Sequence, residues 1–112
     1  MVAEDEALVA EMLTSMLEDS GCIVVGPAFT FDEALSLAET ETGLDLAVLD
    51  INLGGRSVDA VAAVLRKKAV PLIFATGYGA EADGTARDAV VIAKPYTQDR
   101  LELALESALS AR

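Results

Sequence analysis

Short apolar runs alternate with longer amphipathic stretches along the chain, and this alternation predicts a succession of strands and helices. Strands are predicted at residues 1–3, 22–25, 46–49, 72–75 and 90–92, where the runs are apolar throughout. Helices are predicted at residues 7–19, from Thr30 to Gly43, at 58–68, and from Thr97 towards the C-terminus.

Several helix ends carry sequence signals of their own. Thr30 and Glu33 have the spacing of a capping box, and Ser57 and Thr97 can cap the helices that follow them. The stretch 78–88 is polar and punctuated by glycine, so we expect a short or irregular helix there.

Strands that are apolar throughout and alternate with helices indicate an α/β fold with a parallel sheet covered by helices on both faces. We expect a flavodoxin-like sheet of five strands in the order 2-1-3-4-5, in a single domain over residues 1–112. The first strand, residues 1–3, is unusually short, because strands commonly run about five or six residues.

Composition narrows the possible functions. The chain has 19 acidic and 8 basic residues, a formal net charge of −11, so its surface should repel nucleic-acid backbones. It has neither a basic-then-apolar leader nor an apolar run long enough for a membrane span, so we expect a cytoplasmic protein. The absence of histidine and the single Cys22 exclude Ser-His and Cys-His nucleophiles and cysteine-based metal sites.

Polar residues follow the predicted strands at the points where those strands end. Glu4 and Asp5 follow the first strand, Asp50 the third, Thr76 the fourth and Lys94 the fifth. Parallel strands end at one edge of their sheet, so these side chains should converge there. Crowded carboxylates repel one another, and Mg²⁺, which prefers oxygen ligands, would relieve that repulsion. Asp50 could then attack phosphorus, with Thr76 and Lys94 supporting the phosphoryl oxygens.

These motifs resemble the receiver domain of bacterial two-component response regulators. The resemblance rests on VAEDE at 2–6, LAVLDINLGG at 46–55, FATGYG at 74–79 and KPY at 94–96. It implies a signalling domain, not an enzyme, that takes a phosphoryl group onto Asp50 from a histidine kinase or histidine phosphotransferase and signals by contact with a downstream protein. FATGYG looks like the motif of a receiver subgroup that is often single-domain and tied to alphaproteobacterial stress signalling.

The resemblance also implies roles for individual residues. Thr76 and Lys94 would contact the phosphoryl group, and the Lys94–Pro95 bond would be cis. The implied Mg²⁺ ligands are Glu4 (mostly through water), Asp5, Asp50 and the main-chain carbonyl of Asn52. The family usually has an aromatic switch residue where this chain has Val91, and Tyr78 or Tyr96 could replace it.

Other interpretations stay open at this point. A degenerate receiver would act as a constitutive protein-interaction module, and a dimer is possible in either case. A phosphatase of the haloacid-dehalogenase type is disfavoured, because it needs a second acid where Asn52 stands. A flavodoxin-like cofactor binder is disfavoured because Glu4, Asp5 and Glu6 would repel a phosphate after the first strand. The last strand and the last helix are the expected contact region.

Overall fold

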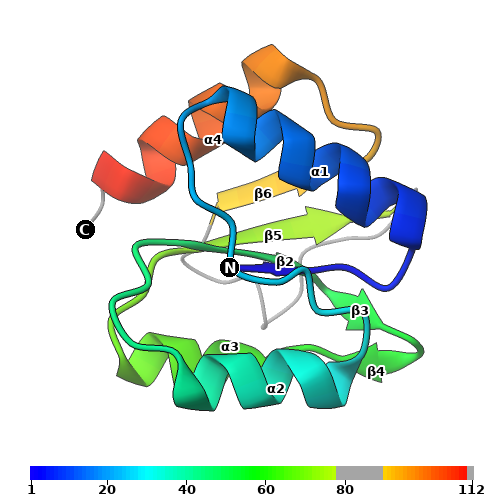
Figure 1. Cartoon of the computed structure of the whole chain (residues 1–112), viewed down its shortest axis with the longest axis vertical. Helices are drawn as coiled ribbons and strands as arrows, with labels where there is room; N and C mark the ends of the chain where they lie inside the picture. The colour runs from blue at the N-terminus through cyan, green and yellow to red at the C-terminus, as the bar shows by residue number, and fades with distance from the viewer. Residues whose placement is uncertain (78–89, 111–112) are drawn as a thin grey trace.

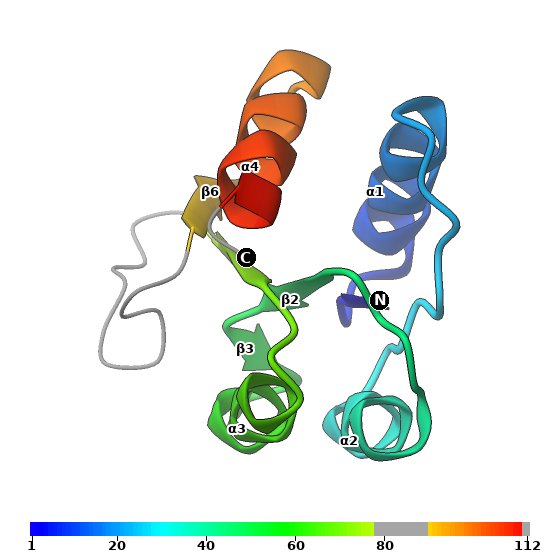
Figure 2. The same cartoon turned by 90° about the vertical axis from the view of Figure 1, so that its left-hand side faces the viewer.

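The computed structural model describes residues 1–77 and 90–110 and has an α/β architecture in three layers. Its main sheet has four parallel strands in the order β1-β2-β5-β6. Helices α1 and α4 cover one face of this sheet and helices α2 and α3 cover the other (Figures 1 and 2). The strands are β1 (Val2–Ala3), β2 (Ala47–Asp50), β5 (Leu72–Thr76) and β6 (Val90–Ala93). The helices are α1 (Ala7–Asp19), α2 (Phe31–Thr40), α3 (Asp59–Lys67) and α4 (Gln98–Ser110).

The central strands are buried because helices pack on both faces. Leu49 and Phe74 lie in the apolar core beneath α2 and α3, whereas Val48 and Ile73 lie in the core beneath α1 and α4. Side chains alternate between the two faces of a strand, so apolar residues are needed at every position. This confirms the predicted fold class. No helix in the described part of the chain is long and apolar enough to cross a membrane.

The prediction of five strands is wrong, because residues 22–25 do not form a regular strand. The segment is extended beside β1, and the Val2 N–H donates to the Val25 carbonyl at 3.1 Å. The next backbone bond to β1 comes from beyond this segment: the Ala28 N–H donates to the Val2 carbonyl at 2.9 Å. Between them lie Gly26, which has φ of 101°, and a proline that has no N–H, so the ladder is interrupted.

A small antiparallel hairpin follows β2 and was not predicted. Its strands are β3 (Asn52–Leu53) and β4 (Arg56–Ser57), joined by Gly54 and Gly55. Both glycines have positive φ, 57° and 86°, as a type I′ turn requires. The hairpin lies at the carboxyl end of the main sheet (Figure 1).

Two of the three predicted helix caps, Thr30 and Thr97, agree with the structure. The Glu33 N–H donates to the Thr30 hydroxyl at 3.1 Å, and the Arg100 N–H donates to the Thr97 hydroxyl at 3.3 Å. The prediction that Ser57 caps the third helix is wrong: its hydroxyl accepts from the Asp59 N–H at 3.2 Å, but α3 begins at Asp59 and its N-cap residue is Val58, which makes no side-chain cap bond. The segment expected to form a short or irregular helix, residues 78–88, lies outside the described residues.

Candidate functional site

The four strands bring the predicted polar residues to one edge of the sheet. Asp50 is the last residue of β2 and Thr76 the last of β5, while Glu4 follows β1 and Lys94 follows β6. The parallel registers align these ends: Asp50 pairs with Ala75, and Thr76 pairs with Ala93. Residues distant in sequence therefore meet because each ends or follows a buried strand.

Lys94 is the electrostatic centre of this edge. Its Nζ lies 2.6 Å from Glu4 Oε1 and 2.8 Å from Asp50 Oδ2. Glu4 is 1% exposed and Asp50 7% exposed, so both acids are largely removed from water. An ammonium shared between two buried carboxylates offsets part of their desolvation.

The pKa shifts at this edge follow from burial and pairing. Burial raises the pKa of Glu4, although the contact with Lys94 and the Glu6 N–H bonded to Glu4 Oε2 at 3.0 Å both oppose the rise. For Lys94, burial lowers the pKa, but the hydrogen bond to Asp50 and the contact with Glu4 outweigh it and leave the pKa raised. Lys94 is therefore a permanent cation at the site.

The carboxylates also form a cluster with the geometry of a cation site. One carboxylate oxygen from each of Glu4, Asp5 and Asp50 lies within 4.8 Å of the other two, and Asp5 is exposed to solvent. A donor set made only of oxygens, with one side open to water, fits Mg²⁺, which keeps several of its waters. The residues present therefore suit the ion that the sequence predicted.

Main-chain N–H groups of the β3–β4 hairpin orient these carboxylates. The Asn52 N–H donates to Asp50 Oδ1 and the Gly54 N–H donates to Asp5 Oδ2, each at 3.1 Å. The Gly55 N–H donates to Asn52 Oδ1 at 2.9 Å, so this amide side chain braces the turn. Sequence reasoning missed these donors, although Gly-Gly between two short runs is a signal for a tight hairpin.

The hairpin register also determines where the Asn52 carbonyl points. Leu53 and Arg56 flank the turn, and in a hairpin with a two-residue turn the flanking pair is the hydrogen-bonded one. Asn52 and Ser57 are then a non-bonded pair, and the main-chain groups of Asn52 face away from β4. Because its N–H points to Asp50, the register predicts that its carbonyl lies on the same side of the strand as that N–H.

Thr76 and the residues considered as a switch occupy different environments. Thr76 is buried at this edge, its carbonyl accepts from the Lys94 N–H at 3.0 Å, and the Lys94–Pro95 bond is cis as expected. Val91 is partly exposed on β6. Tyr96 is buried in the core between the sheet and α1 and α4, and burial raises its pKa. Tyr78 lies outside the described residues, so which residue replaces the aromatic switch stays a prediction.

The fold and this edge together define a class: parallel α/β domains that carry an acidic cluster, a threonine and a lysine at the strand ends. The chain belongs to the response regulator receiver domain family, whose family model matches residues 1–106. This family consists of signalling domains.

Known proteins agree with this assignment. The chain is 34% identical to the transcriptional regulatory protein PdtaR of Mycobacterium tuberculosis, over 98% of this chain and 56% of that protein. It is 33% identical to the phyllosphere-induced regulator PhyR of Methylorubrum extorquens, over 97% of this chain and 42% of that protein. The chain thus spans about half the length of these curated relatives. The solution structure of SdrG from Sphingomonas melonis Fr1 superposes with a TM-score of 0.84 at 40% identity, covering 96% of this chain and 92% of that one.

Proposed function

We propose that the chain is a phosphoacceptor receiver of a two-component or phosphorelay system. A histidine kinase or histidine phosphotransferase donates the phosphoryl group, and Asp50 accepts it. The observation that carries this proposal is the position of Asp50: a buried carboxylate at the end of a central strand, with the Lys94 ammonium 2.8 Å from one of its oxygens.

The transfer requires a nucleophile that is held still and a cationic surrounding. An oxygen of Asp50 forms a bond to phosphorus while the bond from phosphorus to the donor imidazole nitrogen breaks, and the electron pair stays on that nitrogen. The Asn52 N–H fixes one Asp50 oxygen, and Lys94 contacts the other. Lys94 and the Thr76 hydroxyl would then contact the phosphoryl oxygens.

Asp5, Asp50 and the Asn52 carbonyl would hold Mg²⁺, with Glu4 acting mostly through water. When bound, the ion would supply positive charge beside the phosphoryl oxygens. Glu4 is tied to Lys94 and to the Glu6 N–H, which suits a role one shell further from the ion. The chain assists its own phosphorylation and dephosphorylation, and its output is contact with a protein partner.

Intact mass after incubation with acetyl phosphate and Mg²⁺ tests the proposal. The wild type should gain the mass of one phosphoryl group, and the adduct should be absent with EDTA and absent in Asp50→Asn. Asp19→Asn is the matched control, because it makes the same chemical change at an exposed position at the end of α1. It should be phosphorylated like the wild type.

A folded wild type that gains no phosphoryl group, or an Asp50→Asn variant that still gains one, would contradict the proposal. The first result would favour the second candidate, a degenerate receiver that acts as a constitutive interaction module. The two-residue strand β1, which carries Glu4 and Asp5 to the site, is the observation that keeps this candidate in view. Phosphotransfer from a purified phosphorylated histidine phosphotransferase tests the donor class directly.

A further inference from the structure

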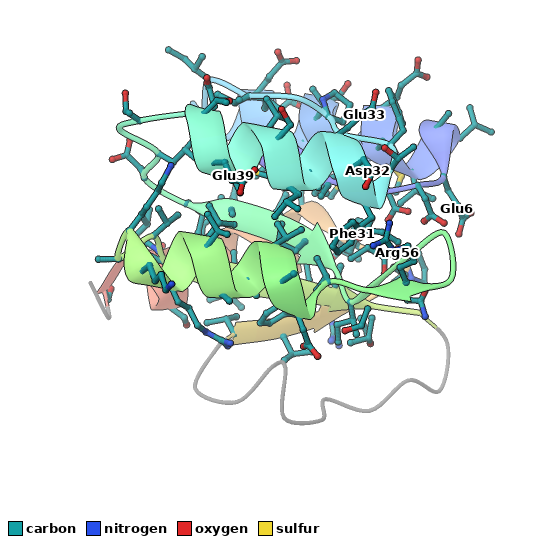
Figure 3. The ribbon with its side chains drawn as sticks, turned by 90° about the horizontal axis from the view of Figure 1, so that it is seen from below. Glu6, Phe31, Asp32, Glu33, Glu39 and Arg56 are labelled. Carbon is teal, nitrogen blue, oxygen red and sulfur yellow. The ribbon has the colours of Figure 1, made fainter. Side chains whose placement is uncertain are left out.

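Arg56, on strand β4, is anchored on the first turn of helix α2. Its guanidinium carbon lies 3.8 Å from the centroid of the Phe31 ring, and its Nη1 lies 3.4 Å from Asp32 Oδ1 (Figure 3). A planar guanidinium can stack on an aromatic face, which an ammonium does less well. Arg56 therefore joins the hairpin to α2 by a contact that depends on its shape as well as its charge.

The stack on Phe31 contributes more to this anchor than the ion pair does. The side chains of Arg56 and Asp32 are 59% and 86% exposed, and a pair this exposed is screened by water. Phe31 is 9% exposed and belongs to the core beneath α2 and α3, so its ring is a fixed platform. The hairpin is thus held on a rigid part of the domain.

The anchored residue is coupled directly to the groups that face the carboxylate cluster. Arg56 pairs with Leu53 across the hairpin, and Leu53 adjoins Asn52, whose N–H donates to Asp50. The turn between Leu53 and Arg56 carries the Gly54 N–H that donates to Asp5. A shift of β4 would therefore displace both N–H donors and the Asn52 carbonyl together.

We propose that Arg56 is a positioning residue for the metal site: its stack on Phe31 holds the hairpin where the Asn52 carbonyl and the Asp5 carboxylate face the cation. This inference rests on the proposed function, since it concerns the Mg²⁺ that phosphoryl transfer requires. Arg56 acts through the hairpin backbone.

Whether removal of Arg56 weakens or strengthens Mg²⁺ binding distinguishes a positioning role from a purely electrostatic one. Removing a positive charge from the hairpin that contacts Asp50 and Asp5 makes the local potential more negative, and that change alone would strengthen Mg²⁺ binding. Loss of a positioning contact weakens binding instead, because the ligands are no longer held in place. The two explanations predict opposite changes in the dissociation constant for Mg²⁺.

A Mg²⁺ titration followed in ¹H–¹⁵N spectra, at one ionic strength and with no phosphodonor, is the test. Arg56→Ala should bind Mg²⁺ about tenfold more weakly than the wild type, as loss of an outer-shell support commonly does. The Gly54 amide should shift even before Mg²⁺ is added, because its bond to Asp5 loosens. Arg56→Lys keeps the charge but stacks less well, so it should lie between the two.

Three further variants serve as controls. Arg100→Ala removes an exposed arginine on α4, across the sheet from the hairpin, and should leave binding unchanged or slightly tighter. Asp32→Asn removes only the exposed ion pair and should bind like the wild type. Phe31→Leu removes the platform while keeping Arg56, and should weaken binding as Arg56→Ala does. Thermal unfolding of Arg56→Ala should match that of the wild type.

Unchanged or tighter Mg²⁺ binding by Arg56→Ala, beside a wild type that binds Mg²⁺, would overturn the positioning role and leave the proposed function intact. Equal weakening by Arg56→Ala and Arg100→Ala would also overturn it, because the effect would then not depend on the hairpin. A wild type that binds no Mg²⁺ would overturn both the positioning role of Arg56 and the proposed phosphoacceptor function. In that case the intact-mass measurement should also find no phosphoryl group on the wild type.

Discussion

The two helical layers of this domain are fastened in different ways. Basic side chains from the α3 side hold both ends of α2: Arg56 contacts its first turn, and Lys68 Nζ donates to three carbonyls at its last turn. Helices α1 and α4 are joined by Gln98, whose Nε2 donates to the Met16 carbonyl at 3.0 Å and to the Ser20 hydroxyl at 2.8 Å. Figure 2 shows the two layers on opposite faces of the sheet.

The layers also differ in the apolar surface that they leave exposed. Among the described helices, the exposed large apolar side chains are all on α1 and α4, and none is on α2 or α3. They are Leu8, Met12, Leu103 and Leu109. Helices α1 and α4 therefore present more large apolar side chains to solvent than α2 and α3 do.

Among the test variants Lys68→Ala, Gln98→Ala, Tyr96→Phe and Leu103→Ser, Lys68→Ala should have the largest effect on stability. It removes hydrogen bonds to the Ala38, Glu39 and Glu41 carbonyls, at 2.7, 3.0 and 3.1 Å. Bonds from a charged donor matter more than neutral ones, so we expect the free energy of unfolding to fall by about 1.5 kcal/mol in urea denaturation. Lys67→Ala, at the exposed neighbouring lysine, is the control, and equal losses in the two variants would refute the fastening role of Lys68.

Gln98→Ala tests the fastening of the other layer. The change leaves the Met16 carbonyl and the Ser20 hydroxyl without this donor, and the expected loss in free energy of unfolding is about 1 kcal/mol. Hydrogen exchange should quicken at the C-terminal end of α1 and not in α2. If amide exchange quickened equally in α1 and α2, the Gln98 bonds would not stabilise the α1–α4 layer separately from the α2–α3 layer.

Tyr96→Phe should stabilise the protein. The Tyr96 hydroxyl is buried with no hydrogen-bond partner among the described residues, so its removal should raise the free energy of unfolding by about 0.5–1 kcal/mol. Because burial raises the folded-state pKa of Tyr96, the wild type should also lose stability as pH rises above the ordinary tyrosine pKa of about 10, and the variant should lose less. Urea unfolding at pH 7 and above pH 10 measures both. A destabilised variant would contradict this prediction.

Leu103→Ser should have the smallest effect on stability. Leu103 is 63% exposed on α4, and an exposed substitution of this kind changes the free energy of unfolding by less than about 0.5 kcal/mol. Leu105→Ser, at a buried position on the same helix, is the contrasting control and should destabilise strongly. If the last helix contacts the donor or the target, Leu103→Ser should slow phosphotransfer from a histidine phosphotransferase and leave labelling by acetyl phosphate unchanged.

Much of the site could be predicted because it depends on a simple rule of topology. Once the strands are placed, the residues that follow them must meet at one edge, and Glu4, Asp50 and Lys94 are indeed in contact there. The sequence could not predict that Lys94 contacts Glu4, because several acids at this edge could pair with its one ammonium group. The N–H groups of Asn52 and Gly54 were also missed, because backbone donors leave no side-chain signal.

The prediction of a second strand failed for a local reason. Ile23, Val24 and Val25 have high strand propensity, yet Ile23 is 95% exposed. The run lies at the edge beside β1, where Gly26 and Pro27 prevent continuous pairing. Strand propensity describes how well a side chain fits the pleated surface of a sheet. Here the backbone after residue 25 interrupts the pairing with β1, so no such surface forms.

That interruption has a consequence for how copies of the chain meet at high concentration. An exposed sheet edge with a continuous row of free N–H and carbonyl groups can recruit a strand from another molecule and start aggregation. A Cβ added at Gly26 would lie 2.9 Å from both the Ala28 nitrogen and the Val2 oxygen, so the irregular backbone is closely fitted to β1. The interrupted pairing at this border leaves no continuous template for an incoming strand, so edge-to-edge association is disfavoured on this side of the sheet.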